Sequence, residues 1–433
     1  MSDEEARMDR LISQKAKRTK DPAISYLLTV ALETPGLISL AAGLVDQDSL
    51  PAKETADLLQ YVQQDEEFRL PSLQYGATEG LLRLRQELMQ YLRESDGVEY
   101  PKDSFGLENV VITNGSQQFL HLVSESLIDP GDIVLVCDPT YFVFLGVLES
   151  VGAKAIGVKL DEQGMNPDAL DRCLASLQAS GEIDRLKMIY ITTYYQNPTG
   201  VSLSLERRKR IFDRVRTLNE EGHCVCLLED TAYRELGFDE DSGPSMKSLD
   251  VDNRFIAMTG SFSKAFAPGL RLGYGIMPPW LTPHVLRQKG NEDFGSTNLN
   301  QHLAWASLSS GELRKHSADL RTLYRRKSEV MREAIEKFFP EGVDWIIPQG
   351  GLYYWVHLPP EIETGGKSEL FKAALEHKTV YVPGECCCAA RPEGPPNRSS
   401  LRLTFAYISE KEITEGVRRL GAAMRQVMKA AHV

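Results

Sequence analysis

Two residues that follow apolar runs of the sequence carry groups that could act on a charged aromatic ligand. Lys264 lies between two predicted strands, in a loop rich in aromatic residues and serines. An amine in such surroundings can lose its proton and attack a carbonyl group. Asp230 ends the run HCVCLLED, and a carboxylate there could hold a protonated ring nitrogen. Taken alone, a solvated lysine and a helix-capping aspartate are the ordinary alternatives.

Three further residues could contact a planar ligand. Asn197 follows another apolar run, in YYQNPTG, and Tyr233 comes three residues after Asp230. Their amide and phenol groups could both bond a ring hydroxyl. Tyr141, in DPTYF, could stack on a ring, although most aromatic residues fill a core.

The segment TNGSQQFL has the features of an anion site. Gly115 frees the backbone, and Ser116 and Gln117 begin a predicted helix whose N-terminal amide groups could bind a phosphate. Further contacts to the same phosphate could come from Ser261, Ser263 and Arg271. An ordinary capped helix would explain this segment equally well on its own.

Arg402 lies inside the strand-like run SSLRLTFAY. An unpaired guanidinium there would be costly, and a bidentate carboxylate would resolve that cost. A structural salt bridge is the ordinary alternative. Together with the amine, the carboxylate and the anion site, Arg402 completes the set of groups that pyridoxal phosphate (PLP) needs to react with an amino acid.

The same motifs occur in the order and spacing of a known family. They are LQYG, TNGSQQ, DPTYF, QNPTG, EDTAY, SFSKAFAPGLRLGY and LRLTF. With them the sequence resembles the class I/II aminotransferases, which are PLP enzymes of fold type I, and among these the 2-aminoadipate and kynurenine aminotransferases. The resemblance implies ping-pong transfer of an amino group from an L-amino acid to a 2-oxo acid.

The resemblance also implies roles for the residues of the cofactor site. Lys264 corresponds to the lysine that attaches the cofactor and shuttles the proton, and Asp230 to the acid that pairs with the ring nitrogen. Asn197 and Tyr233 correspond to the residues that bond the ring oxygen, and Tyr141 to the one that stacks on the ring. The residues corresponding to the phosphate cup are Ser116, Gln117, Ser261, Ser263 and Arg271.

Other matches concern the substrate and a second subunit. Arg402 corresponds to the residue that binds the substrate α-carboxylate, with Gly43 and Asn197 also on the substrate side. Tyr75 corresponds to a tyrosine that reaches the phosphate of the neighbouring subunit, which implies a homodimer with shared active sites. Tyr353 and Tyr354 could shape the substrate pocket.

The sequence departs from the family pattern at two places. Gly43 is followed by Leu44 and Val45 instead of the frequent Gly-x-Pro, so the entrance segment differs. The run Cys386–Cys388 replaces a phenylalanine region after VPGE. We expect these thiols to pack rather than to bind a metal. Cys224 and Cys226 are expected on one buried strand face.

Short apolar runs predict the elements that position these residues. The runs are NVVIT, DIVLVC, KAIGVKL, KMIYITTY, CVCLLED, FIAMTG and LGYGIM, and helical patterns at 117–127 and 205–218 lie between them. This alternation predicts a mostly parallel, doubly wound α/β sheet, with ligands beyond the carboxyl ends of its strands.

The ends of the chain predict a second domain. The runs GGLYYWVHL, TVYVPG and LRLTFAY predict a small antiparallel sheet, and residues 310–339 a long helix. We therefore predict a large PLP-binding domain at 61–310 and a smaller α+β domain at 311–433, to which the N-terminal segment 1–60 contributes. Helical patterns are also predicted at 52–70 and 80–92.

The composition excludes several other classes of protein. The chain has 433 residues and a formal net charge of −12, which disfavours nucleic acid and anionic membranes as partners. Seven unevenly spaced cysteines do not form a disulfide framework. The sequence shows no signal peptide and no run of roughly 18 apolar residues. A cytoplasmic location is expected.

Three other functions compete with transamination as interpretations of this sequence. A PLP-dependent lyase, such as a carbon–sulfur lyase or an enzyme like aminocyclopropane-carboxylate synthase, would use the same residues. A transcription regulator with this fold would need a DNA-binding domain, and the segment before the core is too short for one. A nicotinamide dehydrogenase would need G-x-G-x-x-G at the start of a helix, which the glycines near Lys264 do not form.

Overall fold

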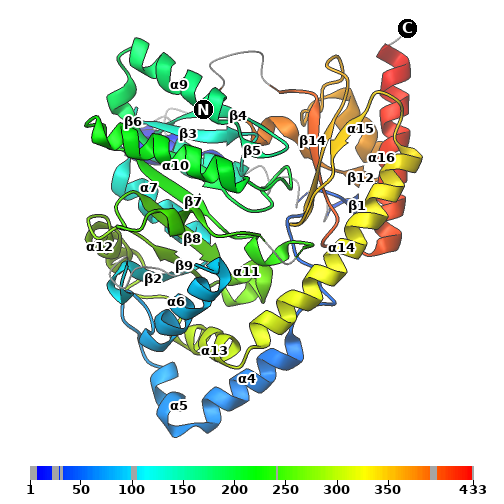
Figure 1. Ribbon diagram of the computed structural model, residues 1–433. Coiled ribbons are helices and arrows are strands. Elements are labelled where there is room, and N and C mark those ends of the chain that lie inside the picture. The colour runs from blue at the N-terminus through cyan, green and yellow to red at the C-terminus, as the bar shows by residue number, and fades with distance from the viewer. Residues whose placement is uncertain are drawn as a thin grey trace.

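A large sheet forms the centre of the computed structural model, which describes residues 7–21, 29, 33–98, 105–239, 242–390 and 397–431 (Figure 1). Within this part of the chain the sheet has eight strands, in the order β2-β9-β8-β7-β6-β3-β4-β5. Their bounds are β2 Val110–Thr113, β3 Ile133–Asp138, β4 Lys154–Asp161, β5 Gly164–Met165, β6 Leu186–Thr192, β7 Cys226–Asp230, β8 Ile256–Ser261 and β9 Gly273–Ile276. All the strands predicted for this sheet are present, and the short β5 was not predicted.

The central strands of this sheet are parallel. The pairs β4–β3, β3–β6, β6–β7 and β7–β8 are parallel, whereas β9 is antiparallel to β2 and β8, and β5 to β4. Parallel neighbours end at the same edge of a sheet, so the last residues of β6, β7 and β8 come together. These residues are Thr192, Asp230 and Ser261.

Helices cover both faces of the sheet, because alternate strand residues point to opposite faces. One face packs against α9 (Pro167–Ala179) and α10 (Leu205–Glu220). The other packs against α7 (Ser116–Leu127), α8 (Phe142–Val151) and α12 (Thr282–Glu292). A third apolar cluster joins β2 and β9 to α6 (Leu82–Asp96) and α13 (Asn298–Ser309). The predicted doubly wound arrangement is therefore confirmed.

A second, smaller sheet lies beside the large one (Figure 1). Its strands, in spatial order, are β10 (Asp344–Ile346), β11 (Tyr353–His357), β14 (Ser400–Thr404) and β13 (Val382–Pro383), and all neighbours are antiparallel. Near the N-terminus, β1 (Ile38–Ser39) pairs in parallel with β12 (Thr379–Val380). Both ends of the described chain thus contribute to this part of the molecule.

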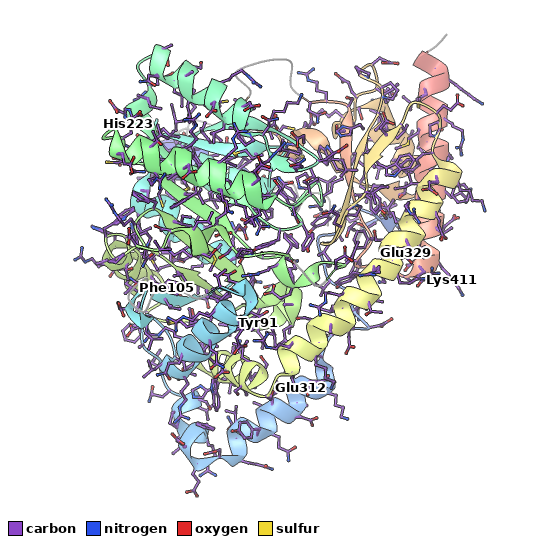
Figure 2. The ribbon with its side chains drawn as sticks, in the orientation of Figure 1. Tyr91, Phe105, His223, Glu312, Glu329 and Lys411 are labelled. Carbon is purple, nitrogen blue, oxygen red and sulfur yellow. The ribbon has the colours of Figure 1, made fainter. Side chains whose placement is uncertain are left out.

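Three helices flank the small sheet. They are α14 (Glu312–Phe338), α15 (Glu369–Glu376) and α16 (Glu410–Ala431). The long helix α14 starts near α13 and runs along α16, so it connects the two sheets (Figure 1). The exposed residues Glu329 on α14 and Lys411 on α16 lie on the outer side of this layer (Figure 2).

The structure corrects three details of the sequence-based expectations. The helix predicted at 52–70 is two helices, α4 (Ala52–Gln64) and α5 (Glu66–Ser72), because Asp65 is extended and its carboxylate caps α5 by accepting from the Glu67 amide. The lysine predicted in a loop lies in the short helix α11 (Phe262–Ala265). Cys226 is buried as expected, but Cys224 precedes β7 and is exposed. A further short helix, α2 (Gln14–Arg18), lies near the N-terminus.

Candidate active site

A cavity of about 130 Å³ lies beyond the carboxyl ends of β6, β7 and β8. The residues predicted to contact the cofactor all line it, with the exception of Tyr75. The lining residues are the last residues of β6, β7 and β8 and residues of the segments that follow β2, β3, β6, β7 and β8. The topology of the sheet therefore brings together residues that are far apart in the sequence.

One end of the cavity has the groups of an anion-binding cup. Gly115, in the left-handed region at φ 75°, precedes Ser116, the first residue of α7. A Cβ atom on Gly273 would lie 2.4 Å from the Ser116 amide nitrogen, so a glycine is needed there for this close approach. The Arg271 guanidinium lies beside Gly115: a Cβ atom built on Gly115 would lie 3.1 Å from Arg271 Nη2. Free helix amides next to an arginine suit a phosphate group.

Two serines of the cup lie around the start of α11. Ser261 caps this helix, because its hydroxyl oxygen accepts from the Ser263 amide over 3.1 Å. Both serines line the cavity, as does Gln117 of α7. The Gln117 side-chain oxygen is buried and has no hydrogen-bond partner among the described atoms. The cup therefore offers polar groups that the protein itself leaves unused.

At another wall of the cavity lies a buried acid. Asp230 is the last residue of β7 and is 4% exposed. Its Oδ1 atom accepts from the Ala232 amide over 3.0 Å, and its Oδ2 atom accepts from the Tyr190 hydroxyl over 2.8 Å. Burial raises the pKa of Asp230, whereas these two hydrogen bonds lower it. A carboxylate in this position suits a cationic group in the cavity, such as a protonated ring nitrogen.

Lys264 points its amine into the region between the cavity and the N-terminal segment. Its Nζ atom donates to the Gly43 carbonyl oxygen over 2.9 Å. Burial lowers the pKa of Lys264, and the positive charges of Arg402 and Arg271 act in the same direction, whereas Tyr353 opposes them. A neutral amine is therefore favoured, and this is the form that acts as nucleophile or base.

Polar groups connect the cofactor residues to the substrate side. The Asn197 amide donates to the Tyr233 hydroxyl over 3.4 Å, and the Asn197 side-chain oxygen accepts from Arg402 Nη1 over 3.0 Å. Burial raises the pKa of Tyr233, so its phenol keeps its proton. Tyr141 directly precedes α8 and lines the same cavity.

Arg402 is buried on β14 without an acidic partner among the described residues. It is 1% exposed, and its Nη2 atom donates to the Ala41 carbonyl oxygen over 2.7 Å. Its guanidinium lies over the rings of Tyr353, at 4.2 Å, and Phe142, at 5.4 Å. The Nε atom is buried and unpartnered. The structural salt bridge that was the ordinary alternative is not found in this part of the chain, and a carboxylate ligand would complete the site.

Among the residues predicted to contact the cofactor, Tyr75 lies away from the cavity. It is 83% exposed and packs edge-on against Phe294, with their ring centroids 5.6 Å apart. Both residues line a separate depression formed by residues 73–76 and 294–298 together with Asn114. A single chain therefore does not bring Tyr75 to Lys264.

The sequence did not single out Tyr190, and it suggested Tyr353 and Tyr354 without distinguishing them. Tyr190 lies within an apolar run, where a tyrosine ordinarily belongs to the core. Tyr353 faces the site, and its hydroxyl lies 3.4 Å from that of Tyr233. Tyr354 faces the opposite way and donates to the Ser328 carbonyl oxygen. The alternation of β-strand side chains would have shown that only one of this pair can face the site.

The three consecutive cysteines lie next to the segment that carries Tyr141. The Cys387 carbonyl oxygen accepts from the Thr140 amide over 2.7 Å. Burial raises the pKa of Cys386 to about 11 and that of Cys387 to about 12, so both thiols stay protonated. Among the described residues no group of three histidine, cysteine or acidic side chains could hold a metal ion. Cys387 belongs to the apolar cluster of the small sheet, and Cys386 packs against that cluster.

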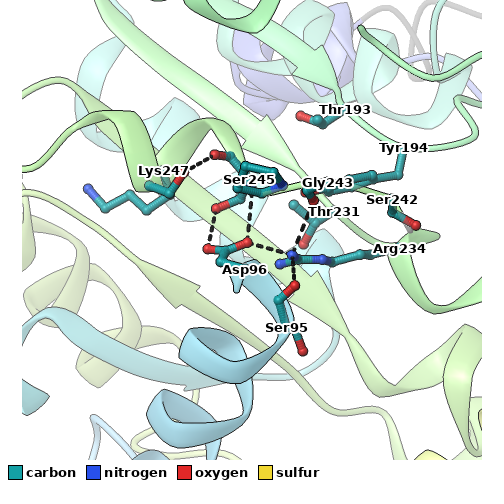
Figure 3. Close-up of polar contacts among 12 residues, drawn as sticks. Ser95, Asp96, Thr193, Tyr194, Thr231, Arg234, Ser242, Gly243, Ser245 and Lys247 are labelled. Carbon is teal, nitrogen blue, oxygen red and sulfur yellow. Dashed lines mark hydrogen bonds and ion pairs between the residues drawn. The ribbon is translucent and has the colours of Figure 1, made fainter. Parts of the chain in front are cut away.

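A buried network of charged groups surrounds Asp96 and Arg234 (Figure 3). Asp96 accepts from the Ser245 amide and hydroxyl, each over 2.8 Å, and pairs with Arg234 over 2.5 Å. Glu229, which precedes Asp230, accepts from the Thr193 hydroxyl and from the amides of residues 246 and 247. The network fixes the chain directly next to Asp230 and Tyr233.

A sequence model described as aminotransferase class I and II matches residues 35–420 of the chain. The chain belongs to this family. Among its relatives, aromatic-amino-acid aminotransferase 1 of Thermococcus litoralis is 32% identical over 421 residues, which cover 97% of this chain and 95% of the relative. The protein is thus an aminotransferase that moves an amino group from an L-amino acid to a 2-oxo acid.

Solved structures of other aminotransferases have the same fold. The kynurenine aminotransferase of Pyrococcus horikoshii, in complex with PMP, has a TM-score of 0.87 at 32% identity and covers 97% of this chain and 98% of its own. The alpha-aminoadipate aminotransferase of Thermus thermophilus, with N-(5'-phosphopyridoxyl)-L-leucine, has a TM-score of 0.82 at 31% identity, with coverage of 98% and 99%. The cofactor of this aminotransferase is PLP, and its fold is type I. The names of these proteins support transamination over the lyase alternative.

The cavity of the aminotransferase fits this cofactor. Its anion cup suits the phosphate, its buried carboxylate suits the ring nitrogen, and Lys264 lies within reach of the same space. Over the described part of the chain, every helix is too short or too polar to cross a membrane.

Proposed function

We propose that Lys264, Asp230 and Arg402 carry the transamination reaction of this enzyme. The observation that supports this most is that one cavity brings Lys264 together with an anion cup and a buried acid. When bound, PLP supplies a ring that stabilises negative charge on the carbon that loses its proton. In this proposal Lys264 attaches the cofactor and moves that proton, and Asp230 keeps the ring nitrogen protonated.

The remaining residues hold the cofactor and the substrate. Ser116, Gln117, Ser261, Ser263 and Arg271 bind the phosphate. On the ring, the proposal assigns Tyr141 to stacking, and Asn197 and Tyr233 to its oxygen. On the substrate side, Arg402 binds the α-carboxylate, with Gly43 and Asn197 beside it. The contacts of Arg402 with Asn197 and of Lys264 with Gly43 support this arrangement.

The amino donor is proposed from the relatives and from the site. The names of the relatives refer to aromatic amino acids, kynurenine and 2-aminoadipate. The aromatic rings of Tyr353 and Phe142 lie beside Arg402, where the backbone of the donor would be held. We propose that the donor is an aromatic amino acid or a long-chain amino acid of the aminoadipate type.

A panel of donors tests this function. Each amino acid is offered with 2-oxoglutarate or pyruvate as acceptor, and the new oxo acid is identified. We expect turnover with at least one donor of the proposed types, and none when the acceptor is left out. Release of pyruvate and ammonia from cystathionine without an acceptor would contradict transamination and identify a lyase.

The enzyme is further proposed to be a homodimer with shared active sites. The exposure of Tyr75 and its distance from the cavity support this, because a second chain could receive its hydroxyl. The test mixes Tyr75→Ala subunits with Lys264→Ala subunits. Each hybrid dimer would contain one intact site, so activity should exceed that of either variant. Sedimentation checks that the two variants have formed mixed dimers. If they have, and the activity of the mixture does not exceed that of either variant, shared active sites are contradicted.

Two broader proposals concern location and domains. All seven cysteines are free thiols, which supports a reducing, cytoplasmic location. The division into residues 1–60, 61–310 and 311–433 is supported by the small sheet and by the pairing of β1 with β12. Imaging of a tagged protein tests the location, and limited proteolysis tests the division into domains.

A further inference from the structure

Tyr190 is a buried residue of β6 whose phenol lies against Asp230. Its side chain is 0% exposed, within an apolar cluster that includes Phe119 and Leu228. Its ring centroid lies 4.1 Å from that of Phe144, on the helix that follows Tyr141. The Tyr190 hydroxyl donates to Asp230 Oδ2 over 2.8 Å. Apolar packing thus fixes a ring whose hydroxyl meets the acid of the cofactor site.

The strand register explains why this phenol reaches Asp230. In the parallel pair β6–β7, Tyr190 is the partner of Leu228 and Thr192 is the partner of Asp230. Residues two positions apart point to the same face of a strand, so Tyr190 lies one step below Thr192 on the face of Asp230. The hydroxyls of Tyr190 and Thr192 are 3.3 Å apart. The direction of the phenol is therefore set by the sheet.

The hydrogen bond acts on the charge of Asp230. Each carboxylate oxygen accepts from one donor among the described residues: the Ala232 main-chain amide for Oδ1 and the Tyr190 hydroxyl for Oδ2. Hydrogen bonds to an ionised carboxylate favour that form against the cost of burial. Burial and the nearby Asp230 raise the pKa of Tyr190, so the phenol keeps the proton that it donates. The Ala232 amide belongs to the main chain, so a side-chain substitution does not remove it. The phenol hydroxyl belongs to the Tyr190 side chain, so a substitution can remove it.

We propose that Tyr190 is a positioning residue that holds Asp230 ionised and directed toward the ring nitrogen of PLP. This inference rests on the role proposed for Asp230. The competing interpretation is a core tyrosine that merely satisfies its hydroxyl with the nearest acceptor. The two interpretations predict different effects of removing the hydroxyl. If Tyr190 positions Asp230, only ligands with a ring nitrogen should bind more weakly, whereas a structural role would weaken the binding of every ligand of the cavity.

The test compares two ligands of the full-length apoenzyme. One is PLP, and the other is its 1-deaza analogue, in which carbon replaces the ring nitrogen. In Tyr190→Phe we expect PLP to bind about tenfold more weakly, from the loss of one charged hydrogen bond, while affinity for the analogue is unchanged. The matched control is Tyr354→Phe, which removes another buried phenol hydroxyl, bonded to Ser328 and outside the site. It should leave both affinities unchanged.

A second readout follows the ring nitrogen in the loaded enzyme. With ¹⁵N-labelled PLP, the nitrogen resonance of Tyr190→Phe should move toward the unprotonated position, and that of Tyr354→Phe should not. Equal weakening of both ligands, or an unchanged resonance, would overturn the proposal. The unfolding midpoints of the two variants show whether each is folded.

Asp230→Asn separates this inference from the function on which it rests. If Asp230 pairs with the ring nitrogen, this variant should lose its preference for PLP over the analogue. A normal preference in Asp230→Asn would overturn the role of Asp230 itself. Loss of preference in Asp230→Asn together with a normal preference in Tyr190→Phe would overturn only the role of Tyr190.

Discussion

Two buried polar regions of this aminotransferase lie next to each other and differ in how their groups are satisfied. In the buried network, Asp96 has Arg234 and Ser245 as partners (Figure 3). Glu229 receives three donors. In the cavity region, Arg402 has a buried Nε atom without a partner. Arg234 also has one buried atom without a partner, Nη1, but its charge is paired with Asp96, whereas Arg402 has no acidic partner among the described residues and is available for a ligand.

The difference separates buried charges that stabilise the fold from those that bind. Both regions bury ionisable groups, so burial alone does not distinguish them. Breaking a satisfied buried ion pair leaves an uncompensated charge, which costs folding free energy. Removing a group that awaits a ligand costs binding or turnover instead. Four experiments can break or sharpen this comparison.

Lys264→Ala should have the largest effect, on turnover. Without the amine that moves the proton, kcat should fall by a factor of about 10²–10⁴, the usual contribution of general acid–base catalysis. The measurement is steady-state transamination with the best donor. The unfolding temperature of the variant should not fall, because a partly buried amine is removed rather than a satisfied ion pair. Normal turnover would remove Lys264 from the mechanism.

Asp96→Asn should mainly affect stability. The unpaired Arg234 should lower the free energy of unfolding by about 3–5 kcal/mol, while kcat per bound cofactor stays close to that of the wild type. Denaturant unfolding measures the first quantity. The control is Glu94→Gln on the same helix, whose exposed pair with Arg314 should be worth only about 0.2–1 kcal/mol. If the two substitutions lowered the free energy of unfolding equally, the distinction between buried and exposed ion pairs would be contradicted.

Arg402→Gln should weaken substrate binding with little change in unfolding free energy. Loss of a charged hydrogen bond to the α-carboxylate corresponds to about 1.5–3 kcal/mol, or roughly a tenfold to hundredfold rise in KM. The comparison substrate is the amine that lacks the carboxylate. The wild type should prefer the amino acid strongly, and the variant should not. A preserved preference would indicate that another group binds the carboxylate.

The smallest expected effect concerns the pH dependence of stability. Burial lowers the pKa of Lys264 in the folded apoenzyme, whereas in the unfolded chain it stays near about 10.4. At pH values between these two pKa values, the unfolded chain binds more protons than the folded one. The free energy of unfolding should therefore rise with pH across this window. The rise should be visible in the difference between wild type and Lys264→Met in urea unfolding. A difference that is flat or falls with pH would contradict the lowered pKa.

The sequence predicted the part of the site that depends on local pattern. Asp230 ends an apolar run, and an apolar run in a parallel sheet ends at the ligand edge. Gly115 and Ser116 at the start of a predicted helix likewise indicated an anion site, to which Ser261 was assigned as a further contact. These signals need only neighbours in sequence and the general topology of α/β sheets, and the structure places all these residues around one cavity.

The sequence could not predict contacts that depend on packing between distant segments. Asp96 and Ser245 are 149 residues apart, and no local pattern links them. The phenol of Tyr190 reaches Asp230 only because β6 and β7 pair in one particular register. Whether Tyr75 completes a site in a second chain depends on an assembly, so it stays a prediction.

The hydrogen bond between Arg402 and the Ala41 carbonyl oxygen joins residues 361 positions apart, close to the two ends of the chain. The residues that line the cofactor cavity, in contrast, all precede residue 272, and β9, which joins β2 to β8, ends at Ile276. During translation, we therefore expect a growing polypeptide to possess the cofactor cradle well before it can recognise an amino acid. Substrate recognition should mature last, when the final stretch of the chain has left the ribosome and docked onto the segment around Ala41.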